Sequence, residues 1–230
     1  MKSDGSGPAK VAIDIWSDVM CPWCVIGYRQ LQTGLAQLAG EIEAEIRWLP
    51  FELNPDMPLE GEESVAHIAR KYGRTLEQAA AGRGQMYAAG ERAGYSFAYT
   101  GESPEPPAML WNTFLAHRLL KWALIEHGAV AQTKLKLALF DAHFQQRRNV
   151  GDPAVLLDVA ESVGLDRAEA EAALADETLA VIVRQEERLA MDQSVTGVPA
   201  MVINGKYMIP GAQEPEVYVA ALRRAVARGI

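Results

Sequence analysis

The chain contains two cysteines, and both lie in the segment Cys21-Pro22-Trp23-Cys24. Residues 11–17, just before this segment, are mostly apolar and predict a buried strand. After it, apolar side chains recur at steps of four and three, as on one face of a helix: Cys24, Tyr28, Leu31, Leu35 and Leu38. Two thiols one helical turn apart at a strand–helix junction can exchange electrons as a pair, so the spacing predicts dithiol redox chemistry.

The expected helix start gives the two cysteines different environments. With Cys21 as the N-cap, Pro22 occupies the first helical position, where its missing N–H has no cost. Cys21 then faces unpaired N–H groups and the positive end of the helix dipole, which favour its thiolate. Cys24 lies on the apolar stripe. We therefore expect Cys21 to be the exposed, acidic thiol that attacks a disulfide, and Cys24 to be the buried thiol that resolves the mixed disulfide.

Other uses of the cysteine pair fit less well. A disulfide that closes so small a ring constrains the unfolded chain little. Structural zinc and iron–sulfur sites need more ligands than one such pair provides. A c-type haem needs a histidine directly after the second cysteine, and Val25 is there instead. We therefore expect no metal site.

Length and composition describe an ordinary globular protein. The chain has 230 residues, 49% of them hydrophobic, and a formal net charge of -8, which disfavours nucleic acid and anionic membranes as partners. No apolar run approaches the ~20 residues that span a bilayer. Residues 1–10 are polar and lack a signal-peptide pattern. The expected compartment is the cytoplasm, where thiols are kept reduced; the oligomeric state is left open.

The order of the expected elements predicts the fold. A second strand is expected near 45–51, and mainly helices from about 64 to 192, including 76–92, 110–127, 130–147 and one starting at Asp152-Pro153. Residues 198–203 and 206–209 then read as a hairpin around Asn204-Gly205, and a last helix begins near Pro215. We therefore expect an α/β, thioredoxin-like fold with a mixed central sheet: residues 1–60 and 193–230 would form the thioredoxin-like domain, and residues 61–192 an all-helical insertion.

Five short segments, in order, resemble the DsbA-like thioredoxin family, and within it the FrnE-like branch of disulfide oxidoreductases. They are residues 17–24 (SDVMCPWC), 50–58 (PFELNPDMP), 112–119 (NTFLAHRL), 197–199 (GVP) and 211–213 (GAQ). The resemblance covers roughly residues 10–228. It implies a cis peptide bond at Val198-Pro199 beside the cysteines, with Cys21, Cys24 and Pro199 as the catalytic residues.

The resemblance also indicates how substrates would bind. Pro22, Trp23 and the backbone of Val198 are the expected contacts with protein or small-molecule disulfides and thiols. No tightly bound cofactor is expected, and glutathione is a candidate redox partner. Two alternatives stay open: a glutathione-dependent isomerase or transferase of small organic substrates, and a chaperone-like binding module. The family's isomerases usually carry serine at the position of Cys21, so the two cysteines favour redox work. The cytoplasmic setting favours a reductase or isomerase over a donor of disulfides.

Several polar residues are candidates for supporting roles. Asp14, inside the first strand, is a possible proton relay to Cys24, the alternative being a solvent-facing or ion-paired carboxylate. Asp18 is expected to accept a hydrogen bond in the turn before Cys21, and His117 to be a core histidine. The remaining histidines, His67, His127 and His143, are too scattered to suggest metal. Either glutathione binding or a turn role is open for Asn54 and Gln213.

Overall fold

The computed structural model describes residues 7–102 and 104–229, so residues 1–6 of the polar N-terminal segment lie outside the described part. Its central feature is a four-stranded mixed sheet with the strand order β2-β1-β5-β6. The strands are β1 (Ala9–Ser17), β2 (Ile42–Pro50), β5 (Ala200–Ile203) and β6 (Tyr207–Pro210). β1 runs parallel to β2 and antiparallel to β5, and β5 pairs antiparallel with β6. The predicted thioredoxin-like α/β fold with a mixed sheet is confirmed.

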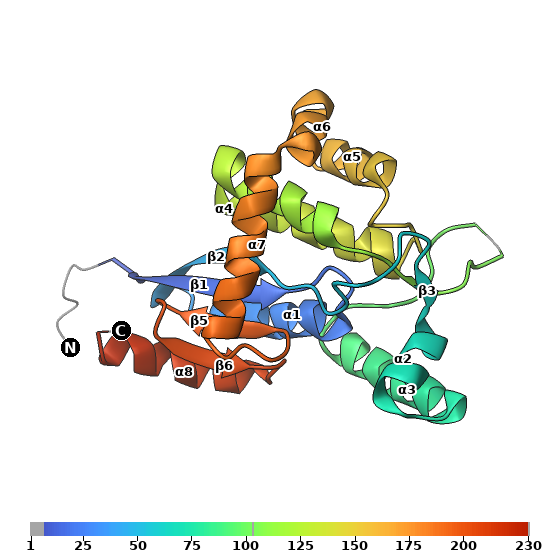
Figure 1. Ribbon diagram of the computed structural model, residues 1–230. Helices are drawn as coiled ribbons and strands as arrows, with labels where there is room; N and C mark the ends of the chain where they lie inside the picture. Colours follow the sequence, from blue (N-terminus) through green and yellow to red (C-terminus); the bar gives the residue numbers. More distant parts are fainter. Residues whose placement is uncertain (1–6, 103, 230) are drawn as a thin grey trace.

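Some helices pack against this sheet and others lie further out (Figure 1). They are α1 (Pro22–Gln37), α2 (Ser64–Tyr72), α3 (Leu76–Arg92), α4 (Phe114–Phe144), α5 (Pro153–Ser162), α6 (Arg167–Ala175), α7 (Glu177–Asp192) and α8 (Pro215–Ala227). A small second sheet pairs β3 (Glu62–Glu63) with β4 (Met109–Leu110). The helix expected from residue 110 begins later, because Met109 and Leu110 form β4 instead.

The two long helices expected on either side of residue 128 form one element with a break. Gly128 has φ 82° and ψ 176°, which is not helical, so α4 consists of two helical segments that meet there. The second segment packs against the edge strand β2. The side chain of Gln132 accepts a hydrogen bond from the N–H of Trp48 (2.9 Å) and donates one to its carbonyl oxygen (2.8 Å). This pairing occupies backbone groups that an edge strand otherwise leaves free.

The two faces of β1 belong to different parts of the core. Ile13 and Ile15 pack in one cluster with Cys24 of α1 and with Phe140 of α4. Trp16 points to the opposite face, where it packs with Ala190 at the end of α7. This alternation follows from the two-residue period of a strand, and it fixes which β1 side chains can approach the cysteines.

The last third of the fold follows the local sequence signals closely. Asn204 and Gly205 both have positive φ, 49° and 70°, and are the central residues of a turn in which the N–H of Lys206 donates to the carbonyl oxygen of Ile203 (3.0 Å). α7 ends at Asp192, next to the predicted boundary between insertion and thioredoxin-like domain. The domain division itself stays a prediction, because one hydrophobic cluster joins Cys24 of α1 to Phe140 of α4 across that boundary.

Candidate functional site

The cysteine pair lies at the first turn of α1, as the sequence predicts. Cys21 is the N-cap and Pro22 the first helical residue, and the N–H of Cys24 donates to the carbonyl oxygen of Cys21 (3.1 Å). Both thiols are free. The expectation that Cys21 is exposed is wrong: it is 3% exposed and Cys24 is 0% exposed. The N-cap position brings Cys21 to the end of the helix, but the chain before β5 covers it.

That covering chain is the segment Val198-Pro199, whose peptide bond is cis. The thiol of Cys21 donates to the carbonyl oxygen of Val198 at 3.5 Å. The segment is held from both sides. Gly211 donates its N–H to the carbonyl oxygen of Pro199 (2.7 Å), and a Cβ on Gly27 of α1 would lie 3.2 Å from the Pro199 ring. Glycine at 27 therefore lets α1 and this segment approach closely.

The two thiols also influence the acidity of each other. A hydrogen bond to Cys24, together with burial, raises the pKa of the Cys21 thiol well above its ordinary value. Burial opposes charge on Cys24 as well, yet the hydrogen bond from Cys21 and the positive charge of Lys136 lower the pKa of the Cys24 thiol. The groups that favour a thiolate thus converge on Cys24, whereas the helix-capping argument placed the acidic thiol at Cys21. Of the two sulfurs, Cys24 is therefore the one whose thiolate its surroundings favour more.

The two residues between the cysteines reach the surface to different extents. Trp23 is 45% exposed, an unusual position for a large apolar ring, and Pro22 is half-buried. An exposed indole next to the covered Cys21 offers an apolar contact to a molecule that approaches the thiols.

Asp18 carries a buried carboxylate just before the pair. It accepts hydrogen bonds from the N–H groups of Met20 (3.2 Å) and Leu53 (2.8 Å), so the expected turn hydrogen bond is present. His117 of α4 lies 3.8 Å away. Burial works against this charge, but the His117 interaction and the Leu53 N–H outweigh it and hold the pKa of Asp18 below its ordinary value. The predicted core position of His117 is confirmed by its burial.

Lys136 on α4 is the residue that the sequence reasoning missed. Its side chain is fully buried among the large core residues, and its charge acts on Cys24, Asp18 and Cys21. The only sequence signal is a lysine next to Leu135 and close to Leu139 and Phe140, on the apolar side of the helix pattern. A lysine at such a position usually buries its stem and keeps its ammonium in water, so the sequence gives little indication that the ammonium of Lys136 is buried.

Asp14 is not brought to the thiols, and the expected proton relay is corrected here. Its carboxylate forms two hydrogen bonds with the Arg47 guanidinium of β2, at 2.7 and 2.9 Å. Its neighbours Ile13 and Ile15 face the cluster that contains Cys24, so Asp14 faces the opposite side of the sheet. The ion-paired alternative is the observed one.

The remaining candidates have structural partners. Asn54 accepts a hydrogen bond from Lys71 (2.7 Å) and contacts His67 (3.0 Å), and Gln213 donates to the carbonyl oxygen of Pro210 (2.7 Å). Within residues 7–102 and 104–229, no group of three or more His, Cys, Asp or Glu side chains is placed to hold a metal ion. In the same part of the chain, no helix is both long and apolar enough to cross a bilayer.

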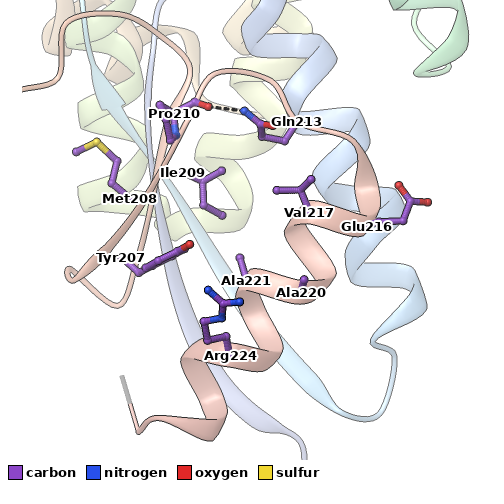
Figure 2. Close-up of a pocket in the computed structure, with 10 residues that line it drawn as sticks. All are labelled: Tyr207, Met208, Ile209, Pro210, Gln213, Glu216, Val217, Ala220, Ala221 and Arg224. Atoms are coloured by element: carbon purple, nitrogen blue, oxygen red, sulfur yellow. Dashed lines mark hydrogen bonds between the residues drawn. The ribbon is translucent and has the colours of Figure 1, made fainter.

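A shallow groove of about 510 Å³ lies between β6 and α8 (Figure 2). It runs from Pro210 and Gln213 to Arg224, and neither cysteine lines it. The Pro210 end of the groove adjoins the Val198-Pro199 segment, because the next residue, Gly211, donates a hydrogen bond from its N–H to the carbonyl oxygen of Pro199. The groove therefore begins beside the cysteine site and extends away from it.

A thioredoxin-like sheet, a C-x-x-C at the start of α1 and the Val198-Pro199 segment beside it define the class of thiol–disulfide oxidoreductases. Residues 12–223 match the DSBA-like thioredoxin domain. The chain belongs to this family.

Individual relatives agree with the family. The chain is 30% identical over 215 residues to the uncharacterized protein YwbO of Bacillus subtilis (strain 168), covering 92% of this chain and 96% of the relative. The structure of the probable DsbA oxidoreductase SCO1869 from Streptomyces coelicolor is similar with a TM-score of 0.81 and 33% identity, over 94% of this chain and 90% of that one. The cytosolic disulfide reductase DsbM from Pseudomonas aeruginosa shares the fold, with a TM-score of 0.61 and 17% identity over 94% and 98% of the two chains.

Proposed function

We propose that this protein is a thiol–disulfide oxidoreductase or isomerase in which Cys21 attacks and Cys24 resolves. The observation that carries the proposal is the hydrogen-bonded pair of free thiols at the N-terminus of α1, with Cys21 against the carbonyl oxygen of Val198. The proposal is supported by the proximity of the two sulfurs to each other and of Cys21 to the backbone of Val198, which is suited to hold a substrate.

The reaction proceeds in two exchanges. The Cys21 thiol passes its proton to the Cys24 sulfur, and the resulting Cys21 thiolate attacks one sulfur of a substrate disulfide. The substrate S–S bond breaks, and the departing thiolate takes up a proton from solvent. Cys24 then loses its proton and attacks the Cys21 sulfur, which forms the Cys21–Cys24 disulfide and releases the second substrate thiol. The substrate gains two electrons from the protein and two protons, one from Cys24 and one from solvent, because Cys21 attacks as the thiolate. A lowered pKa at Cys24 supports the second exchange, because the thiolate is the nucleophile.

Substrate contacts are proposed around the covering segment. The N–H and carbonyl groups of Val198 are suited to an extended substrate backbone, as in strand addition, with Pro199 holding the segment against α1. Pro22 and the exposed Trp23 supply apolar surface beside it. Recognition through backbone groups admits many sequences, so the proposed partners are protein or small-molecule disulfides and thiols.

The cellular role is part of the same proposal. We assign the chain to the FrnE-like branch and expect it to act as a cytoplasmic reductase or isomerase with glutathione as redox partner and no tightly bound cofactor. DsbM, which shares the fold, is described as a cytosolic disulfide reductase and has also been solved with GSH. The alternative, a glutathione-dependent isomerase or transferase of small organic substrates, needs no second thiol.

Insulin reduction driven by dithiothreitol tests the proposal. Wild type should accelerate it, Cys21→Ser should abolish the acceleration, and Cys24→Ser should accumulate a mixed disulfide at Cys21. Full turnover of a small organic substrate by Cys24→Ser, with no insulin reduction by wild type, would favour the isomerase or transferase.

An equilibrium titration against glutathione decides the direction of electron flow. A reduction potential near that of thioredoxin, about -270 mV, fits a reductase, and one near that of DsbA, about -120 mV, means an oxidant.

A further inference from the structure

Lys136 is a fully buried lysine whose ammonium nitrogen makes no hydrogen bond with any described residue. Such a group is rare, because an ammonium ion taken out of water loses its hydration, and a partner must replace what is lost. No carboxylate of the described residues forms an ion pair with it within the 4.0 Å that defines a salt bridge. A local salt bridge therefore does not compensate the burial of this ammonium, and other interactions must stabilise it.

Two aromatic rings supply part of the compensation. The ammonium lies 5.3 Å from the ring centre of Trp48 on β2 and 5.0 Å from that of Phe140 on α4. Cation–π contacts at these distances attract the ammonium to the ring faces, and more strongly away from water than at an exposed site. They also fix the nitrogen in place, since both rings belong to the cluster that contains Cys24.

Three titratable groups act on the charge of Lys136: Cys24 of α1, Cys21 at the N-cap of the same helix, and Asp18 from the turn after β1. His143, also on α4, carries no charge near pH 7, because burial lowers its pKa to about 4. Asp18 already has the Leu53 N–H and His117 as partners. The anion that Lys136 can still balance is the thiolate of the cysteine pair.

We propose that Lys136 is a positioning residue that balances the thiolate of the Cys21–Cys24 pair and thereby makes the pair a stronger oxidant. The inference rests on the proposed redox function and adds a residue to it. When a reduced pair that carries one thiolate becomes a disulfide, it releases two electrons to the oxidant and its remaining proton to solvent. The buried ammonium then loses its anionic neighbour. Lys136 thus stabilises the reduced form over the oxidised form, which raises the reduction potential.

The test compares two lysines on one helix. Lys136→Met keeps a long, unbranched side chain between the two aromatic rings and removes the charge. Lys134→Met removes the same charge from an exposed position two residues away. In redox equilibria with glutathione, Lys136→Met should shift the constant by about tenfold toward the disulfide, which corresponds to about 30 mV for a two-electron couple. Its profile of alkylation rate against pH should move to higher pH. Lys134→Met should match wild type in both measurements.

Each outcome decides the inference separately from the proposed function. If wild type exchanges disulfides with glutathione but Lys136→Met has the same constant and pH profile, Lys136 only serves Asp18 or the core and the inference is wrong. If wild type does not exchange at all, the proposed function has failed first. Should Lys136→Met not fold, Lys136→Gln takes its place, because it removes the same charge and keeps a long side chain with a polar end. An unchanged glutathione constant and an unchanged pH profile in Lys136→Gln would overturn the inference.

Discussion

The sulfur of Cys21 lies 3.5 Å from the carbonyl oxygen of Val198, a residue 177 positions away in the chain. The same contact covers the thiol and places it against the backbone proposed to hold substrate. A substrate segment that bonds to Val198 would therefore compete with the thiol for this carbonyl oxygen and free the sulfur at the site of attack. The carbonyl oxygen of Val198 would thus cover Cys21 in the free protein and bind the substrate backbone in the proposed complex.

The first prediction concerns the order of thiol modification. Cys21, at the end of the helix and next to the exposed Trp23, should react with iodoacetamide before Cys24, which has no exposed surface. Peptide mapping by mass spectrometry after short exposures measures the order. The fast phase should persist in Cys24→Ser and disappear in Cys21→Ser. Earlier labelling of Cys24 would contradict the proposed roles.

Trp23→Ala should weaken the binding of protein substrates and leave the thiols intact. Loss of an apolar contact of about 1 kcal/mol raises KM by about fivefold. The rate with a small aromatic disulfide, which needs no extended contact, should stay within about twofold of wild type, an expectation that follows from the same apolar-area argument. Leu59→Ala, at a side chain that is 84% exposed, is the matched control and should change neither value. An equal loss with both substrates would mean that Trp23 acts on the thiols.

Asp14→Asn should leave the rate of disulfide exchange unchanged, because the carboxylate pairs with Arg47 on the far side of β1. The variant should lose about 0.5–1 kcal/mol of unfolding free energy, the usual range for a partly exposed ion pair. Urea unfolding and insulin reduction, measured on the same preparation, check both parts. A rate that falls tenfold or more at unchanged stability would restore the proton relay.

Loss of the proton from the Glu52 carboxyl should lower the unfolding free energy of the protein as the pH rises toward 7. Burial, followed by repulsion from Glu187, raises its pKa from 4.5 to about 7, although both carboxylates contact Arg184. The folded state therefore binds this proton more tightly than the unfolded state. The associated stability is complete below pH 4.5 and is lost as the pH rises through about 7.

Glu52→Gln should remove that dependence. The unfolding free energy of the variant, relative to wild type, should rise by about 1–3 kcal/mol between pH 5 and pH 8, the size expected when folding raises a carboxyl pKa from 4.5 to about 7. Urea titrations at several pH values provide the measurement. Glu171→Gln, at an exposed position of α6, should run parallel to wild type. A parallel line for Glu52→Gln would show that Glu52 is ionised throughout.

Two glycines of α3 should respond to alanine with opposite signs. A Cβ on Gly90 would clash with the Phe97 ring and lie 2.7 Å from the carbonyl oxygen of Tyr95, so Gly90→Ala should cost about 1–3 kcal/mol through overpacking. A Cβ on Gly84 meets nothing within 4 Å, so Gly84→Ala should stabilise by about 0.5–1 kcal/mol. Denaturant unfolding of the two variants measures both; equal signs would refute the packing argument.

Local sequence determined the parts of this protein that depend on neighbouring residues. The N-cap at Cys21 with Pro22 behind it, the hairpin at Asn204-Gly205 and the break near Gly128 all follow from backbone preferences within a few positions. The pairing of two thiols is also local, since one helical turn joins them. For these elements, the periodicity of apolar residues and the backbone preferences of proline, glycine and asparagine were sufficient to predict the structure.

Tertiary structure decided what surrounds the thiols. The covering of Cys21 by Val198, the burial of Lys136 and the pairing of Asp14 with Arg47 join residues from separate elements. A lysine on an apolar helix face reads the same whether its end reaches water or stops between two rings. The difference is set by how α4 meets β2, and that packing depends on contacts far apart in the sequence. Burial and partner choice, which set the chemistry of a charged group, are therefore properties of the folded chain.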